Sequence, residues 1–125
     1  IGDPQGGQYT AVEALVDAGA TYTTLPASIL RGLGVVPHDR AEFELADGNV
    51  VERDIGRTWV RIDGRSDIVP VVFGDERGGA LLGAVTLEIF RLAVDAVGQR
   101  MIPVRGLLMS LKQWFRRQDA VVAGP

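Results

Sequence analysis

The residues best suited to chemistry lie in the stretch Val12-Glu13-Ala14-Leu15-Val16-Asp17-Ala18-Gly19-Ala20-Thr21. An apolar run leads directly into Asp17, and small residues and a glycine follow at once. Burying a carboxylate at the end of a strand costs free energy unless the group is paired or used. Small residues let the backbone turn tightly and approach another chain or a ligand. Asp17 is therefore the candidate catalytic acid, in a candidate active-site loop formed by Ala18, Gly19, Ala20 and Thr21. The alternative is an Asx turn that merely ends a strand.

A second short motif, Ala80-Leu81-Leu82-Gly83, stands later in the chain. Its two leucines are typical of a short buried strand, and its glycine permits a close backbone approach. Core packing explains Leu81, Leu82 and Gly83 on its own. If the Asp17 loop is functional, the same three residues are expected to support it.

Composition excludes several kinds of site. The chain has no cysteine, so thiol catalysis and cysteine-based zinc sites are excluded. Its single histidine, His38, excludes a multi-histidine metal site and is expected in a surface loop. The formal net charge of −3 gives no reason to expect a nucleic-acid partner. Neither a metal nor an organic cofactor is implied.

The elements that must position Asp17 are those of a single, mostly β domain. The chain has 125 residues, 46% of them hydrophobic, with 16 glycines between short apolar runs. Asp47-Gly48 and Asp63-Gly64 each predict a tight hairpin turn. The remaining expected elements are a strand from Tyr9 to Val16, an extended Thr23–Leu25, a helix from Pro26 to Gly32, a strand from Ile68 to Phe73, a short helix from Val85 to Phe90, and a closing hairpin of Leu92–Asp95 with Met101–Val104 around Gly98.

The C-terminal part has a different pattern. Leu107, Leu108, Leu111, Trp114 and Phe115 share one helical stripe, which predicts an amphipathic helix over 106–118 followed by a loose tail over 119–125. Packing on the domain or at a dimer interface is favoured for this stripe over binding to a membrane surface. The first eight residues, 1–8, are expected to form an irregular leader, and 9–105 the domain itself.

In their order along the chain, these motifs resemble those of the retroviral-type (retropepsin-like) aspartic proteases. Each lobe of that family carries Asp-Thr/Ser-Gly and a later apolar-apolar-Gly, here Asp17-Ala18-Gly19 and Leu81-Leu82-Gly83. The resemblance covers about residues 9–104 and suggests a bacterial single-lobe member. It implies a closed β barrel or sandwich lobe, with one or two short helices beside the C-terminal helix.

The resemblance also implies a homodimer. The family needs two facing aspartates, and the only other Asp-x-Gly, Asp54-Ile55-Gly56, lies just after the first predicted hairpin and has a bulky middle residue. One Asp17 from each chain would then form the pair, as in a two-fold interface. Two carboxylates about 3 Å apart repel by on the order of 5 kcal/mol at an effective dielectric near 20, so they would share one proton. Such shared-proton carboxylate pairs are the general example for this enzyme class.

In the family, the first hairpin would be a flap that closes over an extended peptide substrate. Its tip here would be Ala46, Asp47, Gly48 and Asn49. The tip is polar, unlike the glycine-rich tips of retroviral enzymes. These four residues are the expected flap and substrate-binding positions.

Two departures from the family pattern, together with the alanine at position 20, bear on this resemblance. Ala18 replaces a Thr or Ser whose hydroxyl bonds reciprocally to the partner chain beneath the aspartates. Ala20 cannot donate a hydrogen bond to the carboxylate, which favours a working range less acidic than that of pepsin. An arginine–acid pair of retroviral enzymes is replaced by Ala84 and Tyr22, so both charges are absent together.

The leading interpretation is an aspartic endopeptidase that cleaves extended peptides as a homodimer, with activity weakened by Ala18. The alternative is a non-catalytic dimeric module that binds peptides or acts as a scaffold and keeps the protease fold. A cytoplasmic location is expected, because no signal peptide and no apolar run near the roughly 20 residues of a membrane span stand out.

Overall fold

In the computed structural model, the described residues are 1–95 and 100–105. They form a β-rich domain with short helices. In chain order the elements are β1 (Ala14–Val16), β2 (Thr23–Pro26), α1 (Ala27–Gly32), β3 (Asp39–Glu44), β4 (Val50–Ile62), β5 (Arg65–Gly74), the 3-10 helix η1 (Glu76–Gly78), β6 (Ala80–Leu82), α2 (Ala84–Ile89), β7 (Leu92–Asp95) and β8 (Arg100–Pro103). The expected helix over 106–118, its apolar stripe, the tail and the Gly98 turn lie outside the described residues.

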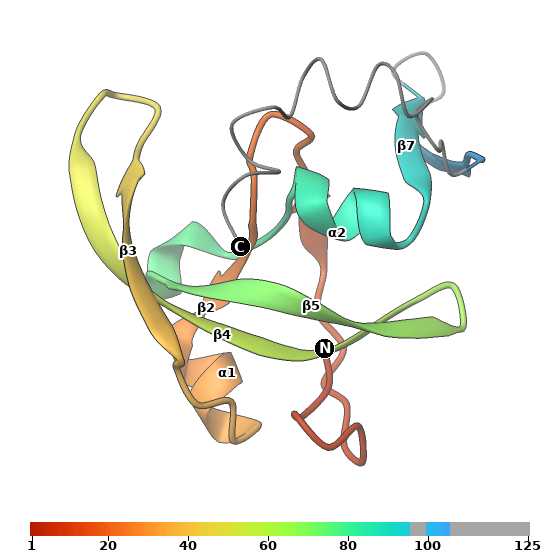
Figure 1. Cartoon of the computed structure of the whole chain (residues 1–125), viewed down its shortest axis with the longest axis horizontal. Coiled ribbons are helices and arrows are strands. Elements are labelled where there is room, and N and C mark those ends of the chain that lie inside the picture. The colour runs from red at the N-terminus through yellow and green to blue at the C-terminus, as the bar shows by residue number, and fades with distance from the viewer. Residues whose placement is uncertain (96–99, 106–125) are drawn as a thin grey trace, which may run out of the picture.

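The main sheet has six strands in the order β1-β6-β2-β5-β4-β3 (Figure 1). Parallel pairing joins β1 to β6 and β2 to β5, whereas β3–β4 and β4–β5 are antiparallel hairpins. Among the described residues β1 and β3 are the two edges, and they do not pair with each other. The mostly β class is confirmed, but the expected closed barrel is wrong, because the sheet stays open between these edges.

A two-stranded arm projects from this sheet. The first residues of β4, Val50 to Asp54, pair only with β3, and β4 joins β5 from Ile55 onward. We call residues 39–54 the arm. In Figure 1 it rises at the left, away from the body of the molecule. Burial falls along it toward the tip, where residues 44–50 are all exposed.

The two Asp-Gly turns differ in conformation. Asp63 and Gly64 both have positive φ, 51° and 79°, as a two-residue hairpin turn requires. At the arm tip only Gly48 does, with φ 87°, and its N–H donates to the carbonyl of Leu45. The arm tip is therefore a longer turn than the expected two-residue one.

The expected strand from Tyr9 to Val16 is too long. Only Ala14–Val16 joins the sheet, and Tyr9 forms an isolated bridge with Gly2. The N–H of Thr10 donates to the carbonyl of Ile1, so this part of the chain pairs with the leader rather than with the sheet. The leader is irregular but anchored, because the N–H of Gly2 donates to the carbonyl of Trp59.

The core lies between the sheet, α1 and α2. Val69, Val71 and Phe73 are alternate residues of β5, so their side chains lie on one face of the strand, and that face is buried. The other fully or nearly buried apolar residues of this cluster are Ile1, Leu25, Leu30, Leu33, Val35, Val60 and Phe90. Leu25 and Leu30 join β2 and α1 to this core, which fixes the strand that follows the Asp17 loop.

Both short helices are present, each shifted by one residue at its start, because α1 begins at Ala27 rather than Pro26 and α2 at Ala84 rather than Val85. Pro26 is the extended residue before α1, where its missing N–H costs nothing. Gly83 is the extended residue before α2. No helix in the described ranges is both long and apolar enough to span a bilayer.

Candidate functional site

Asp17 stands at the exposed end of β1. Its N–H continues the β1–β6 ladder by donating to the carbonyl of Leu82 at 2.9 Å. Its Oδ1 accepts the N–H of Gly19 at 2.9 Å, and its carbonyl accepts the N–H of Ala20 at 3.1 Å. These bonds form an Asx turn that holds the carboxylate at the start of the loop. A Cβ on Gly19 would lie 3.2 Å from Oδ1, so a small residue suits this position.

The second motif contacts the Asp17 loop directly. The N–H of Ala84 donates to the carbonyl of Ala20 at 2.7 Å, and that of Val85 to the carbonyl of Thr21 at 3.0 Å. A Cβ on Gly83 would lie 2.5 Å from the backbone carbon and oxygen of Tyr22. Only glycine allows this approach without a shift, so the start of α2 is a rigid platform for the loop.

A buried hydroxyl pair completes this platform. Thr23 Oγ1 and Thr86 Oγ1 are 2.5 Å apart, and Thr23 Oγ1 also accepts the N–H of Gly83 at 3.1 Å. Both side chains are almost fully buried, so the bonds join β2 to α2 inside the domain. Sequence reasoning missed this pair, because nothing local indicates that residues 63 positions apart meet.

A groove of about 560 Å³ runs beside the loop. One wall is the loop itself and another is the arm, and the floor comes from β5, β6 and the segment around η1. The lining residues include Gly19, Ala20, Thr21, Tyr22, Phe43, Leu45, Ala46, Val51, Arg53, Val72, Asp75 and Leu81. A partly apolar hollow of this size, between a loop and a projecting hairpin, suits a segment of peptide chain.

An aromatic contact fixes which face of the arm looks into the groove. The rings of Tyr22 and Phe43 meet edge to face, with centroids 6.0 Å apart and planes at 86°. Phe43 pairs with Val51, and Ala41 with Arg53, so these residues share the groove face. Tyr22 thus packs on the arm, at the position where the family has an acid.

Arg53 links the arm to the segment after β5. Its Nη2 donates to both carboxylate oxygens of Asp75, at 3.2 and 3.1 Å, and its Nη1 donates to the backbone oxygen of Glu52. The Arg53 side chain is 27% exposed and that of Asp75 is 75% exposed. Both residues line the groove, so the pair joins its arm wall to the segment after β5.

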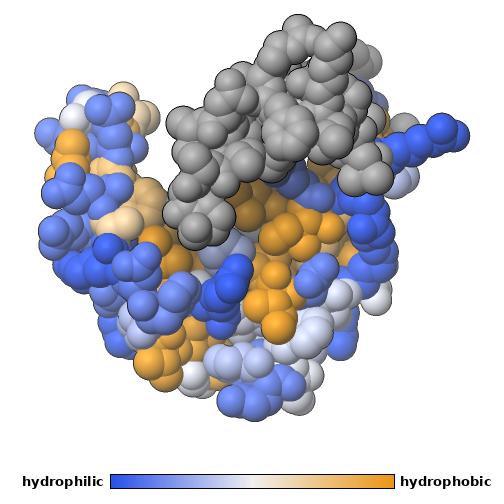
Figure 2. Space-filling view, viewed as in Figure 1, coloured by the Kyte–Doolittle hydropathy of each residue, from blue (hydrophilic) through white to orange (hydrophobic). Residues whose placement is uncertain are grey.

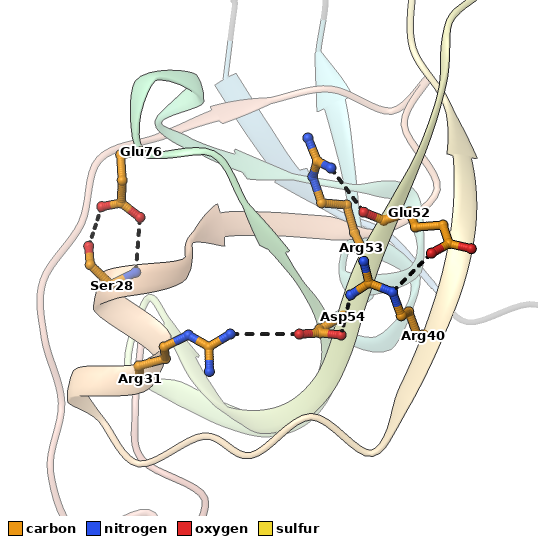
Figure 3. A network of polar contacts seen from close by, with 7 residues as sticks. All are labelled: Ser28, Arg31, Arg40, Glu52, Arg53, Asp54 and Glu76. Atoms are coloured by element: carbon orange, nitrogen blue, oxygen red, sulfur yellow. Dashed lines mark hydrogen bonds and ion pairs between the residues drawn. The ribbon is translucent and has the colours of Figure 1, made fainter.

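The opposite face of the arm carries a second set of charges (Figure 3). Arg40 on β3 donates to Asp54 at 2.8 Å and to Glu52 at 3.2 Å, and Arg31 on α1 lies 3.6 Å from Asp54. Hydrogen bonds to Asp54 and Glu52 raise the pKa of Arg40. The network ties the base of the arm to α1.

A neighbouring contact fastens α1 to η1. The Ser28 hydroxyl and backbone N–H both donate to the carboxylate of Glu76, the latter at 3.0 Å. These bonds lower the pKa of Glu76. They hold the segment that carries Asp75 against the body (Figure 3).

The structure brings together some of the expected site residues and separates others. Gly19, Ala20, Thr21, Ala46 and Leu81 line the groove, and Asp17 lies at its edge, two residues before Gly19. Asp47 and Asn49 bond to each other at the arm tip, and Asp54 is an ion-paired residue within β4. Leu82 and Gly83 do not line the groove and instead contact the Asp17 loop and Tyr22 through their backbones. The described residues contain no group of three or more His, Cys, Asp or Glu that could hold a metal.

Sequence reasoning missed four groove residues, Tyr22, Phe43, Arg53 and Asp75, as candidates for binding. Alternation places Arg53 with Val51 on one face of β4, but only the register between strands shows that this face is the groove face. Asp75 opens the polar, glycine-rich stretch 75–79, in which nothing local marks it for binding. Arg53 and Asp75 form an ion pair only because the fold brings β4 next to the segment after β5.

The chain matches no protein-family model and no curated protein. Among solved structures it is similar to the foamy viral protease–reverse transcriptase in complex with an RNA/DNA hybrid, with 13% identity and a TM-score of 0.53. That match covers 86% of this chain and 13% of the viral chain. The fold is that of a retroviral-type protease.

A second solved structure is the solution structure of the simian foamy virus (mac) protease, at 21% identity and a TM-score of 0.47, covering 61% of this chain and 79% of the viral one. Both structures are of viral proteins. The match to the foamy viral protease–reverse transcriptase supports a retroviral-protease-like fold, and no comparison supports the assignment to a bacterial single-lobe group.

Proposed function

We propose that the chain is an aspartic endopeptidase, active as a homodimer with one Asp17 from each copy. The observation that supports this most is the placement of Asp17 on a loop fastened to Gly83 and α2, at the edge of a groove that has the arm as one wall. An exposed carboxylate on a rigid platform beside a peptide-sized groove suits general acid–base work.

In the proposed reaction the two Asp17 carboxylates share one proton. The ionised carboxylate takes a proton from a water molecule between them, and that water attacks the peptide carbonyl. The protonated partner donates its proton to the carbonyl oxygen, which gives a tetrahedral diol. The C–N bond then breaks as the amine nitrogen takes the proton from the first carboxyl group, and a diol hydroxyl returns a proton to the partner carboxylate, so the pair again shares one proton. The arm acts as the flap and excludes bulk water from the site.

The test is cleavage of a peptide library between about pH 4 and 7. We expect cleavage by the unaltered chain and its loss in Asp17→Asn, which keeps the shape of the side chain but cannot exchange the proton. Asp63→Asn is the matched control, because Asp63 is an exposed turn residue with positive φ, a conformation that Asn tolerates. Cleavage that persists in Asp17→Asn contradicts the proposal.

The second candidate, a non-catalytic dimeric peptide-binding module, is favoured by one observation. Ala18 lacks the hydroxyl that the family uses between the two loops, and the structure leaves its side chain exposed. Peptide binding without cleavage across the same pH range would select this function.

A further inference from the structure

We propose that Arg53 is a specificity-determining residue of the groove and selects peptides that carry an acidic side chain at the subsite between the arm and Asp75. This inference rests on the proposed function, because it names the substrate class of the same groove.

The first step is the direction in which the charges point. Phe43 faces Tyr22 and Arg53 reaches Asp75, so the face of the arm that carries Phe43, Val51 and Arg53 looks into the groove. Glu42 and Glu44 also line the groove, but alternation turns their side chains to the opposite face, where Arg40 meets Glu52. Among the described lining residues, Arg53 and Asp75 are then the charged side chains that face inward.

The second step is the asymmetry within this pair. Arg53 is half-buried and belongs to the long strand β4, whereas Asp75 is mostly exposed and precedes Gly78 and Gly79. An exposed ion pair contributes little and exchanges readily with solvent. A peptide carboxylate can therefore take the place of Asp75 on Arg53 at little cost.

The third step is the donor capacity of the guanidinium. Its hydrogen bonds use Nη2 for Asp75 and Nη1 for the Glu52 carbonyl, and an arginine has five N–H donors in a planar fork. Donors therefore remain for a further acceptor. Arginine binds carboxylates through two parallel hydrogen bonds, which selects an acidic side chain over its amide.

The experiment compares peptides that differ only by Glu, Gln or Lys at one position, scanned along the substrate. All are acetylated and amidated, and one additional series has a free C-terminal carboxylate. We expect the unaltered chain to prefer Glu over Gln in kcat/KM by about tenfold at one position. Arg53→Gln should bring that ratio to about one, and Asp75→Asn should increase it, because the competing carboxylate is gone.

Arg57→Gln is the matched control, since it removes the same charge from an exposed position on the same strand outside the groove lining and should leave the Glu-to-Gln ratio as it was. A fall in cleavage by the same factor for Glu and Gln peptides in Arg53→Gln would mean that Arg53 only holds the arm, and it overturns the inference. So does a preference for Lys, or a preference confined to the free C-terminal carboxylate.

Failure of the proposed function is distinguishable from failure of this inference. Affinities of the same peptides for Asp17→Asn report recognition without cleavage. If no peptide is cleaved but the Glu-to-Gln preference in binding persists and depends on Arg53, the endopeptidase proposal fails and the subsite stands. Equal binding of the Glu and Gln peptides overturns the subsite.

Discussion

Gly83 is the residue on which the position of the Asp17 loop depends most directly. A Cβ there would lie 2.5 Å from the backbone of Tyr22 and 2.9 Å from the carbonyl oxygen of Thr21. Backbone atoms of a packed loop cannot yield as a flexible side chain does. The glycine of the second motif is therefore required by contact with the first.

We expect Gly83→Ala to lower the free energy of unfolding by about 1–3 kcal/mol, because the loop and α2 must separate. Gly32→Ala is the control, since Gly32 ends α1 and nothing lies within 4 Å of its added Cβ. That change should be neutral or stabilise by up to about 1 kcal/mol. Urea unfolding checks both, and equal effects of the two substitutions would contradict this account.

Ala18 is the position at which the resemblance implies a hydrogen bond between the two copies of a dimer, and alanine cannot make it. Its side chain is exposed, so a larger side chain meets no obstacle within the chain. A threonine hydroxyl at this position would restore one hydrogen bond from each copy to the other, each contributing about 0.5–1.5 kcal/mol.

Ala18→Thr should therefore tighten the dimer by about 1–3 kcal/mol, or roughly 5- to 150-fold in Kd. Ala18→Val has the same shape without the hydroxyl and is the matched control. Sedimentation equilibrium measures the dissociation constants. An equal gain with valine would show that packing, not the hydrogen bond, is responsible.

At the scale of elements, the contact between α1 and η1 depends on pH. Hydrogen bonds from Ser28 lower the pKa of Glu76 from its ordinary 4.5, so the ionised form is favoured by folding. A carboxyl group with a lowered pKa in the folded state stabilises the fold above its unfolded pKa. That contribution is lost as the pH falls through its lower folded pKa.

The difference in stability between the unaltered chain and Glu76→Gln should then be constant above pH about 5.5 and shrink as the pH falls below 4.5. Thermal unfolding across this range tests it. In a Ser28→Ala background the pH-dependent part should be smaller, because the hydroxyl no longer donates to the carboxylate. A difference that grows on acidification would reverse the sign and contradict the assignment.

The elements whose signals are local could be predicted from the sequence. Asp63-Gly64 predicts the turn between β4 and β5, and Pro26 predicts the start of α1 to within one residue. The pairing of Leu92–Asp95 with β8 also follows from two short apolar runs. In each case the turn or cap residue and its strand or helix are neighbours in the chain.

Apart from the Asp47-Gly48 tip, where the same local signal forms a longer turn, the failures concern non-local pairing. The parallel neighbours β1–β6 and β2–β5 join residues far apart in sequence, and only their order decides whether the sheet closes. The same holds for the Thr23–Thr86 bond and the Arg53–Asp75 pair. Asp17 could be singled out because its motif is local, whereas the groove beside it is made by register and packing.

On the scale of the whole molecule, the face seen in Figure 2 has apolar surface over the body and a mostly hydrophilic arm. Next to the site, the outward face of β1 carries one exposed apolar side chain. Ala14 and Val16 line an apolar hollow inside, whereas Leu15 is 70% exposed. Leu15 and Asp17 are two residues apart and so share a face. A dimer that brings two Asp17 carboxylates together would also bring the two Leu15 side chains toward its axis.

Leu15→Glu should weaken this dimer, because it would place like charges beside the axis and remove apolar contact. We expect Kd to rise by about tenfold or more, which corresponds to losing the free energy of burying one partly covered leucine side chain in each copy. Val36 is 74% exposed and lies in the loop before β3, so Val36→Glu makes the same chemical change away from the site. We expect Val36→Glu to leave the dissociation constant within about twofold in sedimentation equilibrium, because exposed positions away from an interface contribute little. Equal dissociation constants for the two variants would place the axis elsewhere and separate Asp17 from its proposed partner.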